Sequence, residues 1–168
     1  MGTKTLMSVE EYLHTSFDGA DREYLDGEVV ERNMGNDSHS AVPVEFAFRF
    51  RLQKDRTGLH VRTESRHRVS ENRFRIPDVA VFEGKPTEQV PSDPPLVAIE
   101  ILSPDDRVGY IMPKLEEYRQ WGVRYVWLAD PENRNFFTYG DAGLHQVNEF
   151  SLPEHEIVLT LTDIFGEK

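Results

Sequence analysis

Three short segments of the chain are apolar at nearly every position instead of alternating between apolar and polar residues. They cover residues 76–82, 96–102 and 124–129. Strands that are buried on both faces show this pattern, whereas half-exposed strands alternate. Residues 108–121 instead repeat apolar side chains at helical spacing. These elements predict an α/β fold in which the strands form the centre of a sheet and the helix packs against it.

The beginning of the chain predicts a helix followed by a hairpin. Ser8 precedes Glu11 by three residues, which is the capping box that starts a short helix. Residues 22–25 and 28–31 flank Asp26-Gly27, a dipeptide that is typical of a two-residue hairpin turn.

Residues 38–56 allow two interpretations. Phe46, Phe48 and Phe50 alternate with other residues as in a strand, whereas Val42, Phe46 and Phe50 recur at helical spacing. The length of the segment favours the helix.

Two further regions are expected to be β structure. Residues 59–69 alternate and are expected to form one exposed strand. Residues 135–139, 144–150 and 157–161 are expected to form a closing β meander.

Length and composition narrow the class of protein. The 168 residues suit a single domain over residues 1–168, and 38% hydrophobic with 29% charged residues is typical of a soluble globular chain. No apolar run approaches the ~20 residues that cross a bilayer. Residues 1–7 are too short and polar for a signal peptide, so a cytoplasmic location is expected. The absence of cysteine leaves carboxylates and imidazoles as side-chain metal ligands.

The charge of the chain is unevenly distributed. The formal net charge is −11, which argues against indiscriminate coating of nucleic acid. Residues 49–75 nevertheless carry nine Lys or Arg and three acids. This basic segment is either a surface that faces phosphates, or a solvated surface that contacts the acidic remainder of the protein.

Two of the predicted central strands each contain one acid among apolar residues. These acids are Asp78 in 76–82 and Glu100 in 96–102. Burial of an unpaired carboxylate is costly, so each acid requires a cation or hydrogen-bond donors. A structural salt bridge would explain either acid alone, but two such acids on consecutive strands favour a site for one hard divalent ion.

Lys114 is a third charge in a predicted interior position. It lies three residues after Ile111 and four before Tyr118, on the apolar stripe of the 108–121 helix. Either it extends to solvent at the edge of the stripe, or it reaches over the sheet towards the two carboxylates.

Several motifs occur in the order of a known family. Pro77-Asp78, then Glu100, then a lysine resembles the PD-(D/E)XK nuclease motif, although Leu102 stands where the usual lysine would be. The chain resembles the Uma-type restriction endonuclease family, in which the lysine has moved to the following helix. The resemblance rests on residues 7–12, 24–29, 77–78, 100–104, 114–115 with Tyr118, and 122–123 followed by 127–131. It implies a restriction endonuclease-like core with a central mixed β-sheet flanked by helices, an N-terminal helix and hairpin, a helical 38–56 segment and a C-terminal β meander.

The resemblance also implies a function and a site. The function is hydrolysis of phosphodiester bonds in DNA by an endonuclease that uses Mg²⁺ or Mn²⁺, and a homodimer could cut both strands. Asp78, Glu100 and the carbonyl of Ile101 would bind the metal, and Lys114 would be the catalytic lysine. Each of Asp78→Asn, Glu100→Gln and Lys114→Ala is expected to abolish cleavage and to leave the fold intact.

Further residues are expected to support this site. Glu28 matches an accessory acid of the family, with an ordinary exposed strand residue as the alternative. His39 matches a histidine that could contact phosphate, with a polar helix-terminal residue as the alternative. Arg62, Arg66 and Arg68 are the expected DNA-binding arginines of the basic segment.

Three residues depart from the family pattern. Tyr110 stands where an aspartate is usual, Tyr125 replaces a common acid, and Pro113 precedes Lys114 and could shift the start of the helix. Two other functions therefore stay open. One is a DNA-binding or regulatory module without catalysis, and the other is an interaction protein whose acidic exterior contacts a basic partner.

Overall fold

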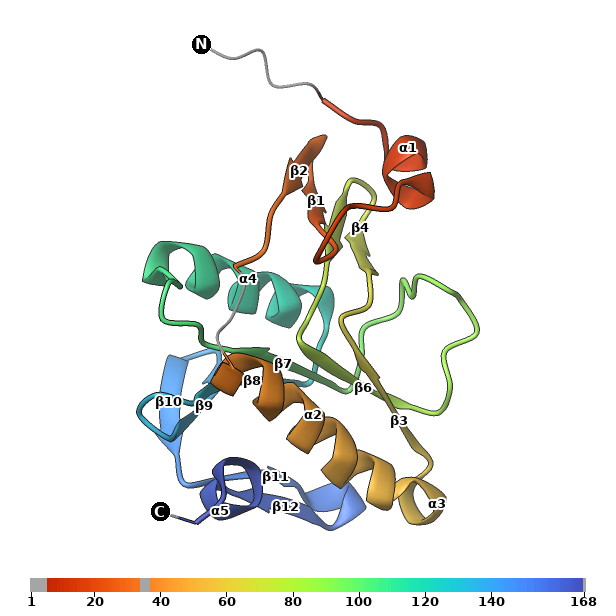
Figure 1. The fold of residues 1–168 in the computed structure, drawn as a ribbon. Helices are drawn as coiled ribbons and strands as arrows, with labels where there is room; N and C mark the ends of the chain where they lie inside the picture. Colours follow the sequence, from red (N-terminus) through yellow and green to blue (C-terminus); the bar gives the residue numbers. More distant parts are fainter. Residues whose placement is uncertain (1–5, 34–36, 168) are drawn as a thin grey trace.

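The computed structural model describes residues 6–33 and 37–167. Within these residues the centre is a mixed sheet in the order β10-β9-β8-β7-β6-β3 (Figure 1). In chain order its strands are β3 (Leu59–Thr63), β6 (Val79–Glu83), β7 (Val97–Ile101), β8 (Tyr125–Asp130), β9 (Asn135–Gly140) and β10 (Gly143–Val147). β7 and β8 are parallel, and the other neighbouring pairs are antiparallel. The mixed central sheet confirms the predicted fold class.

The parallel pair is joined by α4 (Val108–Trp121), which returns the chain over the sheet. A crossover of this length is what two parallel neighbours require. All five residues of β7 are buried, as expected for a strand covered on both faces. α4 ends at Gly122, where φ is 108° and the glycine amide donates to the carbonyls of Tyr118 and Arg119. A side chain at this position would strain the left-handed backbone that closes the helix.

Helices cover both faces of the sheet, as Figure 1 shows. α2 (Asp37–Leu52) lies on one face and buries Val42, Phe46 and Phe50 against the strands, which confirms the helical interpretation of this region. α4 packs on the opposite face, where Leu115 and Tyr118 contact buried residues of β7 and β8. The short helix α3 (Lys54–Thr57) follows α2.

The C-terminal region completes the face that carries α2. It consists of β11 (Glu149–Leu152), a 3-10 turn over Pro153–His155, β12 (Ile157–Thr160) and α5 (Leu161–Phe165). Phe150 stacks on both Trp127 and Phe136, with ring centroids 4.3 and 4.1 Å apart. The prediction of a single strand over 144–150 is wrong, because these residues belong to two strands, β10 and β11. Only β10 belongs to the central sheet, while β11 pairs with β12.

A second sheet, in the order β2-β1-β5-β4, stands beside the central one. Its strands are β1 (Glu23–Leu25), β2 (Glu28–Val30), β4 (His67–Ser70) and β5 (Arg73–Arg75). The predicted hairpin is confirmed, with Asp26 and Gly27 at φ values of 53° and 98° in its turn. The predicted capping box of Ser8 and Glu11 begins α1 (Val9–His14). Tyr12 of α1 packs with Tyr24 and Phe74 to form a small core of this sheet.

Two expected strands differ from the structure. Residues 59–69 form two strands, β3 and β4, which belong to different sheets. The chain changes direction at Glu64, whose φ of 52° is incompatible with a continuous strand. Residues 76–82 do not form one strand either, because β6 begins only at Val79. Asp78 therefore lies just before a central strand and not inside it.

None of the helices in the described part of the chain has the length and apolar character needed to span a membrane.

Candidate catalytic site

Asp78, Glu100 and Lys114 converge on one cavity of about 20 Å³. Val79 of β6 faces Ile99 of β7, so continuing this antiparallel register places Asp78 across from Glu100. Lys114 approaches from the face of α4 that packs on the sheet. A cavity of this size holds roughly one water-sized particle. The alternative that Lys114 extends to solvent is wrong, because the residue is only 2% exposed.

Asp78 is held by two hydrogen-bond donors, and a histidine from a third part of the chain lies near it. Its Oδ1 accepts a hydrogen bond from Nη2 of Arg32 at 2.7 Å, and its Oδ2 accepts one from the amide of Ile101 at 2.7 Å. Nε2 of His39 lies 3.7 Å from the same Oδ2. Burial raises the pKa of Asp78 to about 6, although Lys114 and Arg32 oppose the shift.

Glu100 is held by two side chains of α4. Its Oε2 lies 2.9 Å from Nζ of Lys114, and its Oε1 accepts a hydrogen bond from the Tyr118 hydroxyl at 2.7 Å. Burial raises the pKa of Glu100 to about 7, and the attraction of Lys114 only partly offsets it. A carboxyl with so high a pKa gains from an additional cation.

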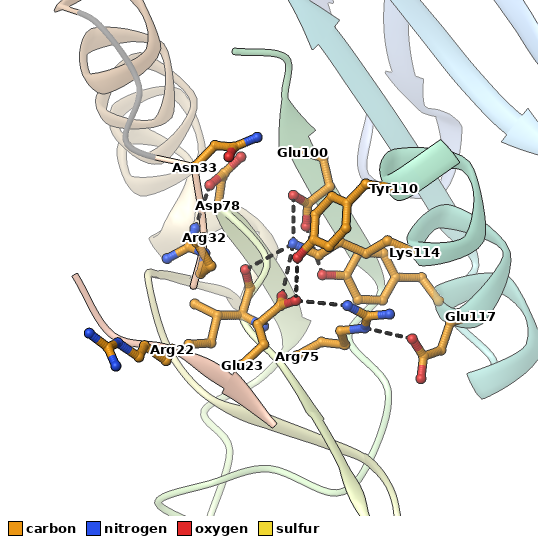
Figure 2. A network of polar contacts seen from close by, with 12 residues as sticks. Arg22, Glu23, Arg32, Asn33, Arg75, Asp78, Glu100, Tyr110, Lys114 and Glu117 are labelled. Atoms are coloured by element: carbon orange, nitrogen blue, oxygen red, sulfur yellow. Dashed lines mark hydrogen bonds and ion pairs between the residues drawn. The ribbon is translucent and has the colours of Figure 1, made fainter. Parts of the chain in front are cut away.

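Glu23 is a buried acid of this network that the sequence did not reveal. It is fully buried on β1, and Figure 2 shows Lys114 and Arg75 meeting at it. Its carboxylate lies 2.9 Å from Nζ of Lys114 and 2.7 Å from Nη1 of Arg75, and it accepts hydrogen bonds from the Tyr110 hydroxyl at 2.9 Å and the Ile76 amide at 3.0 Å. Burial alone would raise the pKa of Glu23, but these donors, above all Lys114, lower it to about 2. Glu23 therefore stays ionised and positions the Lys114 ammonium.

Arg32 is a second residue that the sequence did not reveal. Its guanidinium bridges Asp78 and Glu64, with only 9% of the side chain exposed. Arg32 follows β2 in a segment without regular structure, so no periodic pattern marks it. The change of direction at Glu64 brings its carboxylate to the guanidinium. Figure 2 shows Arg32 beside Asp78.

The accessory residues expected from the resemblance lie at different distances from the cavity. His39 lines the cavity. Glu28 is half-buried on β2 and is not among the lining residues, so its role stays a prediction.

The residues that depart from the family pattern differ in their places. Tyr110 lines the cavity and donates to Glu23, while Tyr125 donates to Glu154 at the surface. Pro113 does not shift the helix start, because α4 begins five residues earlier at Val108.

The three predicted DNA-binding arginines differ in their surroundings. Arg62 lies over the ring of Phe82 and donates to the carbonyl of Gln89. Arg68 is exposed and donates to the carbonyl of Glu71. The guanidinium of Arg66 contacts both Asp21 oxygens at 2.6 Å, donates to the carbonyls of Tyr12 and Thr15, and lies 4.3 Å from the Tyr12 ring. The contacts of Arg66 thus support a structural role, in which it ties α1 to the chain that enters β4.

Replacement of Arg66 by alanine is expected to lower the free energy of unfolding by about 3 kcal/mol, because partly buried acceptors lose a charged donor. Arg68→Ala is the matched control and is expected to change it by less than about 1 kcal/mol, since Arg68 is exposed. Urea unfolding of the two variants measures the difference. Equal, small effects would contradict the structural role and return Arg66 to the candidate nucleic-acid interface.

The carboxylates that line the cavity fit a hard divalent cation as a pair of ligands and not as a larger group. The described residues contain no group of three or more His, Asp and Glu side chains arranged to hold a metal ion. Magnesium, however, commonly uses one or two protein carboxylates and keeps several of its waters. Asp78 and Glu100 supply such a pair of carboxylates. Burial raises the pKa of both, so the neighbouring cations and hydrogen-bond donors only partly offset the cost of burying their negative charges.

The sheet, its flanking helices and the charges gathered at one point define a domain of the restriction endonuclease-like fold. Residues 9–166 match the model of Uma2, a family described as "Putative restriction endonuclease". The chain belongs to the Uma2 family.

Comparison with solved structures supports the fold. The structure is similar to that of a putative nuclease belonging to DUF820 from Anabaena variabilis ATCC 29413. The TM-score is 0.80 at 21% sequence identity, and the match covers 95% of this chain and 97% of the other. No curated protein matches the chain.

Proposed function

We propose that the protein is a metal-dependent nuclease that hydrolyses phosphodiester bonds in DNA. The observation that carries this proposal is the convergence of Asp78, Glu100 and Lys114 on one small cavity. Membership of the Uma2 family supports the same reaction class. Buried charges in a cleft with strongly shifted pKa values are typical of catalytic sites.

Asp78, Glu100 and the carbonyl of Ile101 would hold Mg²⁺ or Mn²⁺. The bound ion would supply an activated water and neutralise negative charge on the phosphate. In the structure the carboxylate of Asp78 accepts hydrogen bonds from Arg32 and the Ile101 amide. The carboxylate of Glu100 accepts hydrogen bonds from Lys114 and Tyr118. Each carboxylate oxygen has a further lone pair, so an ion can share these groups with their donors.

Lys114 would act as a fixed positive charge and not as a base. Burial lowers the pKa of Lys114, but Glu100 and Glu23 outweigh it and raise the pKa above its usual value. The ammonium therefore keeps its proton at neutral pH and would stabilise the negative charge that develops on the phosphate. Arg32 and His39, which line the cavity, would contact the flanking phosphate oxygens.

A cleavage assay tests the proposal. Supercoiled, linear double-stranded and single-stranded DNA and a matched RNA are incubated with the protein and Mg²⁺, Mn²⁺ or EDTA. Cleavage of DNA is expected with either metal and not with EDTA.

Sedimentation of the protein with duplex DNA separately tests whether a homodimer supplies two sites for the two strands. The cleavage assay decides the function itself. Absence of cleavage under all conditions, or cleavage undiminished in EDTA, would reject the function.

Metal affinity is expected to increase with pH between pH 6 and 8. A carboxyl must lose its proton before it binds a metal, and burial raises the pKa of Asp78 to about 6 and that of Glu100 to about 7. Protons therefore compete with the ion at pH 6, and the affinity there should be roughly tenfold lower than at pH 8. Calorimetry in two buffers that differ in ionisation enthalpy measures both the affinity and the protons released. Equal affinities at the two pH values would contradict the assigned ligands.

A DNA-binding module without catalysis is a second candidate function. The observation in its favour is that all four oxygens of Asp78 and Glu100 already contact a donor or cation of the protein. This alternative predicts salt-sensitive DNA binding that depends on Arg62 and Arg68 and is the same in Mg²⁺ and in EDTA. DNA-binding measurements in Mg²⁺ and in EDTA, made on the protein used for the cleavage assay, distinguish the two functions.

A further inference from the structure

A larger cavity of about 330 Å³ adjoins the cavity of Asp78, Glu100 and Lys114. The two share Asp106 and Ile111 as lining residues. The larger cavity lies at the carboxyl ends of β7 and β8, beside the start of α4. Ligands of open α/β sheets bind outside the carboxyl ends of the strands, so its place in the fold suits a ligand site.

The lining of the larger cavity combines apolar and polar side chains. The apolar lining residues, here called the wall, are Leu102, Val108, Ile111, Met112, Leu128, Phe137 and Leu144. The acidic and amide lining residues, here called the rim, are Asp106, Asp130, Glu132 and Asn133. Three rim carboxylates would repel a phosphate, but they can accept hydrogen bonds from a neutral ligand. The cavity therefore suits a flat, mostly apolar group with amino donors at its edge.

We propose that this cavity binds a nucleobase with an exocyclic amino group, from the nucleotide whose phosphate lies beside the catalytic cavity. The proposal rests on the proposed function, because a nucleic acid bound at the catalytic cavity presents such a base. One sugar links the phosphate of a nucleotide to its base, so a phosphate near Lys114 places a base within reach of the adjoining cavity. Bases that are splayed out of a stack commonly enter apolar pockets and are recognised at their polar edges.

Glu132 is the acceptor assigned to the amino group. Both Asp130 oxygens accept hydrogen bonds from Asn133, and those of Asp106 accept from Asn33 and Ser103. Glu132 is exposed at the rim, and its carboxylate makes no hydrogen bond to any other residue in the described ranges. Carboxylates accept well from the amino group of cytosine, whereas uracil and thymine present a carbonyl at that position.

Methyl NMR titration in EDTA tests the cavity without requiring cleavage. The probes are 2′-deoxycytidine 5′-monophosphate, 2′-deoxyuridine 5′-monophosphate and 2-deoxyribose 5-phosphate, called here the cytidine nucleotide, the uridine nucleotide and the sugar phosphate. The cytidine nucleotide is expected to shift the methyl signals of Leu102, Met112 and Leu144 in a saturable way, and not those of Val158, which lies on β12. The uridine nucleotide should bind roughly tenfold more weakly, because it lacks the amino donor. The sugar phosphate should not shift these signals.

Two variants test the assigned acceptor. Glu132→Gln is expected to reduce the preference for the cytidine nucleotide to within about twofold. Glu149→Gln, at an exposed position of β11, is the matched control and should keep the full preference. Failure of the cytidine nucleotide to shift the cavity methyls, an equal response to the sugar phosphate, or a full preference in Glu132→Gln would overturn the inference.

The outcomes separate this inference from the proposed function. Nucleotide binding in this cavity by a protein that does not cleave DNA would reject the nuclease and keep the base site. Metal-dependent cleavage by a protein whose cavity methyls do not respond would keep the nuclease and reject the base site.

Discussion

Lys114→Ala is expected to abolish cleavage and to lower the free energy of unfolding by about 3–5 kcal/mol, because it leaves two buried carboxylates without their shared cation. Lys114 is 2% exposed, and its ammonium lies 2.9 Å from both Glu23 and Glu100. The sequence alone predicts loss of activity with an intact fold. The structure changes this expectation, since the lysine is part of the interior and not only of the reaction.

Unfolding in urea at pH 8 and cleavage assays on the same samples measure the two effects. Arg119→Ala is the matched control on α4, because Arg119 pairs with Glu116 and Asp141 at the surface and its side chain is 36% exposed. It is expected to retain full activity and to lose less than about 1 kcal/mol. A Lys114→Ala protein as stable as the wild type would contradict the described network, and undiminished cleavage by a folded Lys114→Ala protein would reject its catalytic role.

Glu100→Gln is expected to abolish metal-dependent cleavage without loss of stability. Burial raises the pKa of Glu100 to about 7 from 4.5, so the folded protein binds a proton more tightly than the unfolded chain. The stability that this group contributes is present below pH 4.5 and is lost as the pH rises through 7. The neutral glutamine avoids this loss, and in metal-free buffer at pH 8 the variant should be more stable by up to about 3 kcal/mol.

The pH dependence identifies the cause of this gain. The difference in unfolding free energy between Glu100→Gln and the wild type is expected to grow from pH 5 to pH 8. His67 acts in the opposite sense, because burial lowers its pKa to about 4 and its contribution is lost as the pH falls from 6.5 through 4. Both proteins carry His67, so its effect cancels in the difference. A difference that does not vary with pH would contradict the raised pKa, and metal-dependent cleavage retained by Glu100→Gln would reject the assigned ligand.

Much of the fold could be predicted from local pattern. The capping box at Ser8, the Asp26-Gly27 turn and the fully apolar strand β7 each follow from a few adjacent residues. One failure occurs where the chain changes direction without a glycine or proline. Residues 59–69 alternate throughout, yet the backbone at Glu64 sends the second half to another sheet. Alternation shows that a segment is extended, but it does not show which strand will pair with it.

The sequence by itself determined Asp78, Glu100 and Lys114 as candidates, because each is an ionisable residue in an apolar context, and burial of a charge is too costly to be accidental. It determined the central strands from their nearly continuous apolar residues and the helix that carries the lysine from the helical spacing of its apolar residues. Only the tertiary structure decided which partners these charges have. Glu23 and Arg32 come from the hairpin and the segment after it, distant in sequence from the three candidates, and their contacts form only when the second sheet packs beside the central one. Likewise, Arg66 resembles Arg62 and Arg68 in sequence, and only the packing of α1 shows its guanidinium enclosed by Asp21 and Tyr12.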